Sequence, residues 1–354
     1  MTHAIIMAGG VGTRFWPRSR KKKPKQLLNI LGKKTLIQET VTRISPLVAQ
    51  ENILIVTTKS LAPEIRRLLP QLQDENFVIE PVGRNTAPCI GLAALKVTEK
   101  DPDGIMVVLP ADHLISDVER FLECLRHAIE TVKYNDAIVT LGIHPTHPET
   151  GYGYIQYDVH SQHPTGAYNV KTFAEKPYLD TAKLFLASGD FLWNSGIFIW
   201  SVQRILREIE QSMPDLHSAL NEIRCLKGSN KEATLESIYH NLRPNSIDYG
   251  VMERATNVAV VKGDFYWTDV GSWAEVYKIS PKDENGNVNL NNHIFFNSRD
   301  CYVVSEDRFV VMLGVKNLIV VNTPDALLIC HRDSAQDVKL VVEHMERQKI
   351  NKYL

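Results

Sequence analysis

The chain has 354 residues, of which 44% are hydrophobic and 23% charged, and its formal net charge is −1. This balance gives no electrostatic support to a nucleic-acid partner, and no apolar run approaches the length of a membrane span, so we expect neither nucleic acid nor membrane as a partner. Five scattered cysteines without a Cys-x-x-Cys pair argue against a disulfide framework or a zinc site. We therefore expect a cytoplasmic globular protein of one large or two ordinary domains.

The first 142 residues alternate short apolar runs with amphipathic segments. The apolar runs predict strands at residues 4–8, 53–57, 77–80, 105–109 and 137–141. The amphipathic segments predict helices at residues 36–44, 61–69, 87–99 and 118–132. Continuous apolar strands separated by such helices indicate an α/β fold with a mostly parallel central sheet covered on both faces. Ligands of such sheets bind beyond the carboxyl ends of the strands.

Residues 143–282 have a more mixed pattern, which we interpret as the second half of the same domain. Strands are expected at 151–154, 170–176, 197–200 and 258–262, and helices at 180–188, 201–212 and 230–240. The domain would then span residues 1–282, with a nucleotide bound by its half at 1–142 and another substrate by its half at 143–282.

The polar stretch 283–287 is the best candidate for a linker to a C-terminal module. Beyond it, short apolar runs separated by turn residues lie at 294–296, 302–304, 309–312, 318–321 and 326–330. Their close spacing predicts a small all-β module over residues 288–354, closed by a helix around 337–348. The module is too small for a well-buried core of its own, so we expect it to pack on the main domain or on a second subunit, and we favour a homodimer.

The most informative segment follows the first strand and reads Gly9-Gly10-Val11-Gly12-Thr13-Arg14. Glycines there permit positive φ and let successive N–H groups form an anion-binding nest. Within twelve residues follow seven cations, namely Arg14, Arg18, Arg20, Lys21, Lys22, Lys23 and Lys25. Neither the P-loop nor the dinucleotide pattern fits, because a Gly-Lys-Ser/Thr and a third spaced glycine are missing. The loop is typical of a polyphosphate site, and the alternative is a structural turn with a solvated basic stretch.

Polar residues also follow several other strands. Asp112, after the strand at 105–109, and Asp269, before a glycine turn, are candidate ligands of Mg²⁺, which prefers a few carboxylates plus phosphate oxygens. Either aspartate could instead cap a helix or form a turn. Glu175 and Lys176 end a strand, where the lysine could meet a phosphate and the glutamate sugar hydroxyls. Asn194 offers an amide beside Gly196.

Together these segments resemble the nucleotide-sugar pyrophosphorylase family, whose signature matches Gly9 to Arg20 with Pro24-Lys25-Gln26. Six further blocks narrow the resemblance to the branch of bacterial mannose-1-phosphate guanylyltransferases. They are Gly-Arg-Asn-Thr-Ala-Pro at 83–88, Leu-Pro-Ala-Asp-His at 109–113, Gly-Tyr-Gly-Tyr at 151–154, Glu-Lys-Pro at 175–177, Asn-Ser-Gly at 194–196 and Ser-Ile-Asp at 246–248. The resemblance extends from residue 3 into the region 318–345.

The resemblance implies a Rossmann-like nucleotidyltransferase domain followed by a short left-handed β-helix. It implies that GTP and mannose 1-phosphate react, with Mg²⁺, to GDP-mannose and pyrophosphate by in-line attack. The β- and γ-phosphates would be bound by Gly9, Gly10, Gly12, Thr13 and Arg14. Lys25 would neutralise the α-phosphate, and Asp112 and Asp269 would hold the metal. Lys176 would orient the sugar phosphate, while the sugar pocket would be shaped by Gly153, Glu175 and Asn194.

Within the resemblance, Glu80 is the candidate reader of guanine, because one carboxylate can accept from both N1–H and the N2 amine. Arg84 and Asn85 lie close by in the chain, and the alternative is that Glu80 merely ends a strand.

Long relatives add an isomerase domain, so we expect no isomerase activity from this chain. Two other functions stay open: another sugar 1-phosphate nucleotidyltransferase, for instance for a heptose, and a non-catalytic nucleotide-sugar sensor. The intact set Arg14, Lys25, Asp112, Lys176 and Asp269 argues against the sensor.

Overall fold

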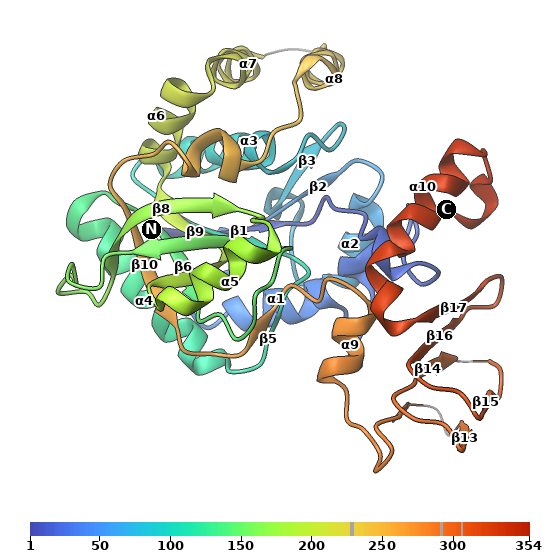
Figure 1. Cartoon of the computed structure of the whole chain (residues 1–354). Coiled ribbons are helices and arrows are strands. Elements are labelled where there is room, and N and C mark those ends of the chain that lie inside the picture. The colour runs from blue at the N-terminus through green and yellow to red at the C-terminus, as the bar shows by residue number, and fades with distance from the viewer. Residues whose placement is uncertain (227–229, 291–292, 306) are drawn as a thin grey trace. The chain divides into compact units, whose positions relative to one another are not determined.

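The computed structural model describes residues 1–226, 230–290, 293–305 and 307–354 (Figure 1). The chain forms two compact units, and neither is continuous in sequence. The first, called the sheet unit here, comprises Met1–Gly9, Thr40–Ala111 and Ile115–Trp267. The second, called the β-helix unit, comprises Gly10–Glu39, Asp112–Leu114 and Thr268–Leu354. The segment that carries most of the glycine loop and the basic residues therefore folds with the C-terminal part of the chain.

The sheet unit is built on nine strands in the order β3-β2-β1-β4-β9-β6-β10-β8-β7. Their bounds are β1 Thr2–Met7, β2 Ile53–Thr58, β3 Phe77–Glu80, β4 Ile105–Pro110, β6 Ile138–Ile143, β7 Gly153–Tyr157, β8 Tyr168–Glu175, β9 Phe191–Ser201 and β10 Val258–Gly263. Strands β3, β2, β1 and β4 are parallel, as are β6 and β10. Strand β9 is antiparallel to both β4 and β6, and β7 and β8 are antiparallel to their neighbours, so the sheet is mixed.

The helices of the first half begin and end close to the predicted positions. They are α1 Leu36–Ile44, α2 Ala62–Leu68, α3 Thr86–Lys100 and α4 Val118–Asn135. The later ones are α5 Leu179–Ser188, α6 Val202–Ser212, α7 Pro214–Cys225 and α8 Lys231–Asn241, followed by the π-helical turn Asp248–Met252. Helix α7 was not predicted, although a proline at its first position is a typical start signal. Among the residues that the structure describes, no helix has the length and apolar character needed to cross a membrane.

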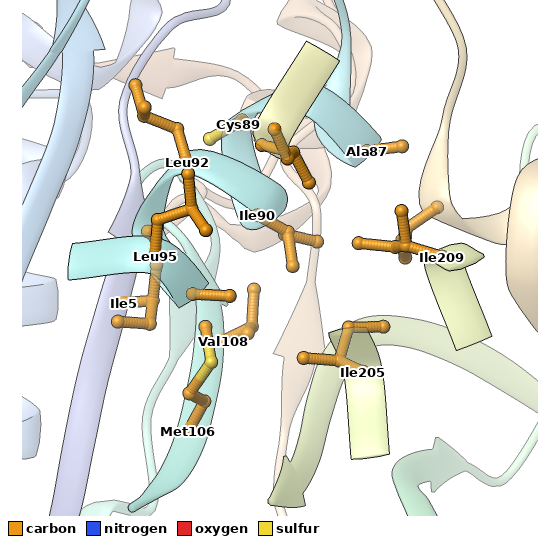
Figure 2. Packing of buried hydrophobic residues seen from close by; sticks show 14 of the residues in the cluster. Ile5, Ala87, Cys89, Ile90, Leu92, Leu95, Met106, Val108, Ile205 and Ile209 are labelled. Atoms are coloured by element: carbon orange, nitrogen blue, oxygen red, sulfur yellow. The ribbon is translucent and has the colours of Figure 1, made fainter. Parts of the chain in front are cut away.

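One core of the sheet unit holds α3 against the parallel strands and α6 (Figure 2). Ile90 of α3, Ile5 of β1, Val108 of β4 and Ile205 of α6 are fully buried in it. Each such side chain contributes about 1.5–3 kcal/mol when removed from water. This packing fixes the start of α3 and therefore the loop that precedes it, which carries Asn85.

The β-helix unit contains short strands, which are β12 Val288–Asn289, β13 Ile294–Phe296, β14 Tyr302–Ser305, β15 Val311–Leu313, β16 Leu318–Asn322 and β17 Leu327–His331. Strands β12, β14 and β16 pair in parallel, as do β13 and β15, whereas β17 pairs antiparallel with β16. Helices α9 Trp273–Ile279 and α10 Val338–Arg347 flank them. The stacked parallel pairing agrees with a β-helix, and its left-handedness stays a prediction.

The core of the β-helix unit joins the N-terminal segment to the C-terminal strands. Phe15 and Leu28 pack with Trp273, Tyr302 and Ile319, and all five are buried. The rings of Phe15 and Trp273 are 5.0 Å apart between centroids. The predicted small module thus acquires its core by sharing one with residues 10–39, and the same packing supports the glycine loop.

Candidate active site

The glycine loop folds back onto the segment that contains Lys25. Gly12 has φ +66°, and an added Cβ would collide with the Cβ of Lys25, so only glycine fits there. The amide of Gln26 donates to the Gly10 carbonyl at 3.0 Å, and the hydroxyl of Ser19 donates to the Gly12 carbonyl at 2.7 Å. The positive φ expected of the loop glycines occurs at Gly12, whereas Gly9 and Gly10 do not adopt it.

Lys25 connects the two predicted metal ligands. Its side chain is buried, and its Nζ donates to Oδ2 of Asp112 at 2.8 Å and to the backbone carbonyl of Asp269. Burial opposes ionisation of Asp112, but the charges of Lys25 and His113 outweigh it and lower the pKa of this carboxyl group. The Asp112 side chain is 33% exposed, so an ionised carboxylate is open to a cation.

The donor set is compatible with a magnesium site. Among the described residues, no cluster of three or more His, Cys, Asp or Glu side chains could hold a metal by itself. Magnesium uses one or two carboxylates and completes its shell with water and substrate phosphates, so a larger cluster is not required. The Lys25 ammonium group contacts both the Asp112 carboxylate and the Asp269 backbone carbonyl. Binding of Mg²⁺ by these two aspartates stays a prediction.

Thr13 and Arg14 lie in the 3₁₀ turn Thr13–Phe15, directly after Gly12. Arg14 is partly buried, and its Nε is a buried donor that has no hydrogen-bond partner among the described residues. An unsatisfied buried donor costs about 1–3 kcal/mol. A phosphate at this turn would remove that cost, which agrees with the nucleotide role predicted for Arg14.

Glu80 ends strand β3 as a buried carboxyl group beside Gly9. An added Cβ at Gly9 would lie 3.7 Å from Oε2 of Glu80, and Oε1 has no hydrogen-bond partner in the part of the chain that the structure describes. Burial raises the pKa of Glu80 to about 8, although a hydrogen bond with the Cys89 thiol opposes the rise. The group is therefore mostly protonated at neutral pH, and its Oε1 is buried without a hydrogen-bond partner among the described residues.

Arg84 and Asn85 have structural contacts that the sequence did not indicate. The Arg84 guanidinium donates to the carbonyls of Tyr239 at 2.8 Å and His240 at 2.6 Å, near the end of α8. Asn85 caps α3 by accepting from the Thr86 N–H at 2.8 Å, with φ 70° and ψ −171°. That backbone conformation is strained for a residue with a side chain, and such strain clusters at functional sites. Contacts of Arg84 and Asn85 with a nucleotide stay predictions.

The four residues predicted for the sugar phosphate gather at β7, β8 and β9. Gly153 pairs with Glu175 across β7 and β8, and an added Cβ at Gly153 would lie 2.5 Å from Oε2 of Glu175 and 3.3 Å from Cβ of Asn194. Lys176 contacts Oε1 of Glu175. Partial burial disfavours the charged lysine, but the hydrogen bond and charge of Glu175 outweigh it and raise the pKa of Lys176.

Asp248 belongs to the same cluster and was given no role from the sequence. Its Oδ1 accepts from the Asn194 amide at 2.9 Å, and burial, followed by the charge of Glu175, raises its pKa to about 6. The block Ser-Ile-Asp at 246–248 was the available signal. The Ile247 N–H donates to the Thr86 hydroxyl at 2.8 Å, so the residue before Asp248 is tied to the start of α3.

Comparisons with known proteins agree with this architecture. The nucleotidyl transferase family matches residues 3–286, and a MannoseP isomerase/GMP-like beta-helix domain matches residues 291–345. Mannose-1-phosphate guanylyltransferases of Klebsiella pneumoniae and Escherichia coli are each 40% identical over 358 residues, which is 99% of this chain and 75% of theirs.

Solved structures are also similar to this chain. A structure described as mannose-1-phosphate geranyltransferase from Thermus thermophilus has a TM-score of 0.88 at 33% identity, covering 98% of this chain and 99% of its own. One described as mannose-6-phosphate isomerase from Helicobacter pylori has a TM-score of 0.61 at 26% identity, covering 75% and 99%. The chain therefore belongs to the nucleotidyl transferase family and, within it, to the mannose-1-phosphate guanylyltransferases.

Proposed function

We propose that this enzyme transfers GMP from GTP to α-D-mannose 1-phosphate and releases GDP-mannose and pyrophosphate. The observation that carries the proposal is 36–40% identity to mannose-1-phosphate guanylyltransferases over nearly the whole chain. Two residue clusters support it: the glycine loop with Lys25 and an ionised Asp112 suits a triphosphate, and the carboxylates and amide around Gly153 suit sugar hydroxyls. We also propose a cytoplasmic location.

In the proposed step, a phosphate oxygen of mannose 1-phosphate forms a bond to the α-phosphorus of GTP. The bond between that phosphorus and the oxygen bridging to the β-phosphorus breaks, and pyrophosphate leaves with the electron pair. Both reactants are anions, so catalysis depends on positioning and on neutralising charge. Arg14 and the loop N–H groups would hold the β- and γ-phosphates, and Lys25 would neutralise charge at the α-phosphate.

Asp112 and Asp269 would hold Mg²⁺. When bound, that ion supplies charge neutralisation at phosphate oxygens. Lys25 keeps Asp112 ionised and in place through the 2.8 Å hydrogen bond, so the carboxylate is ready before the substrates bind.

The sugar-phosphate residues would act by hydrogen bonding. Lys176 would orient the phosphate of mannose 1-phosphate, and Glu175, Asn194 and Asp248 would bind the sugar hydroxyls. Gly153 lets the Glu175 carboxylate and Asn194 lie close to the backbone, where an added Cβ would collide with Glu175.

The test measures pyrophosphate release with GTP, UTP or dTTP. Each nucleotide is combined with mannose 1-phosphate or with another sugar 1-phosphate, such as a heptose 1-phosphate. We expect release only with GTP and mannose 1-phosphate together. Hydrolysis of GTP at a comparable rate without any sugar phosphate would contradict the transferase. A preference for another base or sugar would leave a nucleotidyltransferase of different specificity, and inactivity with every pair would favour a binding protein.

We also propose a homodimer assembled through β13 and β15. Ile294, Phe296, Val311 and Leu313 are 48–66% exposed on this paired strand surface. Contiguous exposed apolar side chains are typical of protein interfaces. Light scattering at micromolar concentration should give a dimer that Phe296→Glu converts to a monomer, whereas Leu184→Glu, on exposed α5, should leave it intact. A wild-type monomer would contradict the proposal.

A further inference from the structure

The seven cations near the glycine loop do not form one cluster. Lys25 is buried against Asp112, whereas several others line a separate cavity of about 730 Å³ within the β-helix unit, a volume typical of small-molecule sites. The basic residues that line it are Arg18, Arg20, Lys21, Lys22, Lys23 and Lys352. The acidic lining residues are Asp307 and Asp325. We propose that this cavity binds a phosphorylated small molecule that carries a hydroxyl or amino group, apart from the residues assigned to the two substrates.

A short hairpin holds the central lysines in place. The Arg20 N–H donates to the Lys23 carbonyl and the Lys23 N–H donates to the Arg20 carbonyl, both at 3.0 Å. The Arg20 guanidinium also donates to the Pro17 carbonyl at 2.7 Å and pairs with Asp325 at 3.0 Å. The backbone of the lysine-rich turn is therefore organised before a ligand arrives, which lowers the entropic cost of binding.

The positive charge of the cavity is only partly neutralised. Arg20 pairs with Asp325, and Lys21 pairs with Glu346 at 2.9 Å. Lys22 and Lys23 are exposed, and neither forms an ion pair with any described residue. Two ammonium groups on one fixed turn, without a carboxylate partner, favour an anion with several negative oxygens, as a phosphate has.

A buried amide adds a second kind of contact. Asn322 lines the cavity and is 5% exposed, and its Nδ2 donates to the Ser305 hydroxyl at 3.0 Å and to Oδ1 of Asp307 at 2.6 Å. Both amide hydrogens are thus used, whereas Oδ1 of Asn322 is buried and has no partner among the described residues. Because an unpaired buried acceptor is costly, a hydroxyl or amino group of the ligand fits here. The phosphate would meet the lysines, and the rest of the molecule would meet Asn322.

An occupant would also touch the chain that leads to Lys25. The hairpin ends at Lys23, and Pro24 and Lys25 follow directly, with the Lys25 N–H bonded to the Val11 carbonyl at 3.3 Å. A ligand in the cavity therefore restrains the segment that carries Lys25. Binding itself is independent of the proposed transferase activity, and only a consequence for turnover rests on it.

Titration calorimetry with GDP and, separately, with inorganic tripolyphosphate tests the site by stoichiometry. We expect wild type to bind two GDP molecules per chain, and Lys22→Ala/Lys23→Ala to lose one of them or to bind it at least roughly tenfold more weakly. The matched control Lys33→Ala/Lys339→Ala removes the same charge from exposed positions outside the cavity and should keep both sites.

If Lys22→Ala/Lys23→Ala kept every GDP site and every tripolyphosphate site of the wild type, or if the control variant showed the same loss, the proposal would be overturned. If tripolyphosphate bound in the cavity but GDP did not, the proposed contact of Asn322 with a hydroxyl or amino group of the ligand would be refuted. Because the cavity variants leave the proposed substrate residues intact, they should retain pyrophosphate release with GTP and mannose 1-phosphate. The binding result therefore stands whether or not the transferase assay succeeds.

Discussion

The buried carboxyl group of Glu80 should make both stability and GTP binding depend on pH. In the folded protein its pKa is about 8, whereas the ordinary pKa of a glutamate side chain in water is 4.5. As pH rises, the unfolded chain therefore releases this proton at a lower pH than the folded protein does. The free energy of unfolding falls between pH 4.5 and about 8, and it no longer changes above about pH 8. Between pH 6 and 8.5 the loss amounts to roughly 2–3 kcal/mol of unfolding free energy. Glu80→Gln, which has no charge to bury, should not show it.

For binding, the carboxylate is the form that accepts from guanine N1–H and the N2 amine. With a pKa of about 8, the ionised fraction rises from about 9% at pH 7 to about 76% at pH 8.5. If only this form reads guanine, the apparent affinity for GTP should rise roughly eightfold over that interval. Glu80→Gln should lose roughly ten- to a hundredfold in GTP efficiency at the higher pH, because an amide donor then faces a donor.

The assay compares wild type and Glu80→Gln in two ways at pH 6 to 8.5. Denaturant unfolding without ligand gives the stability difference, and steady-state kinetics with GTP and ITP gives the binding difference. ITP lacks the N2 amine, so it should be a poorer substrate and lose less on mutation. If the unfolding free energies of wild type and Glu80→Gln changed by the same amount over this pH range, the proposed effect of the buried carboxyl group would be refuted. Equal losses for GTP and ITP would show that Glu80 does not contact the N2 amine.

The remaining predictions concern the proposed substrate residues. Asp112→Asn and Asp269→Asn should each lower turnover roughly a hundredfold or more without loss of helical circular dichroism, and near-normal rates at ordinary Mg²⁺ would remove that residue from the metal site. Lys25→Ala should mainly lower kcat, whereas Lys176→Ala should mainly raise the KM for mannose 1-phosphate, and the reverse pattern would exchange their roles. Gly153→Ala should raise the same KM at least roughly tenfold with GTP binding unchanged, because its Cβ overlaps Glu175. An unaltered KM would mean that the sugar binds elsewhere.

Local sequence determined the elements of the first half of the chain. Helix α1 was predicted at its observed bounds, and the apolar runs that became β1 to β4 lie within one or two residues of the structure, because continuous apolar strands and amphipathic helices are encoded within a few residues. The glycine loop and Asp112 were recognisable for the same reason. A positive φ that favours glycine, and a carboxylate that directly follows a strand, are both visible in a short stretch of sequence.

Tertiary structure alone decided how these parts combine. Strand β9 enters between β4 and β6 from a distant part of the chain, which makes the sheet mixed, and no local pattern encodes such a pairing. The burial that raises the pKa of Glu80, and the contact of Asp248 with Asn194, likewise depend on residues remote in sequence. The basic stretch is an example: its cations lie close together in the chain, but folding turns Lys25 inward to Asp112 and leaves Lys22 and Lys23 in a separate cavity. Position in space, and not spacing in sequence, determines which charges act together.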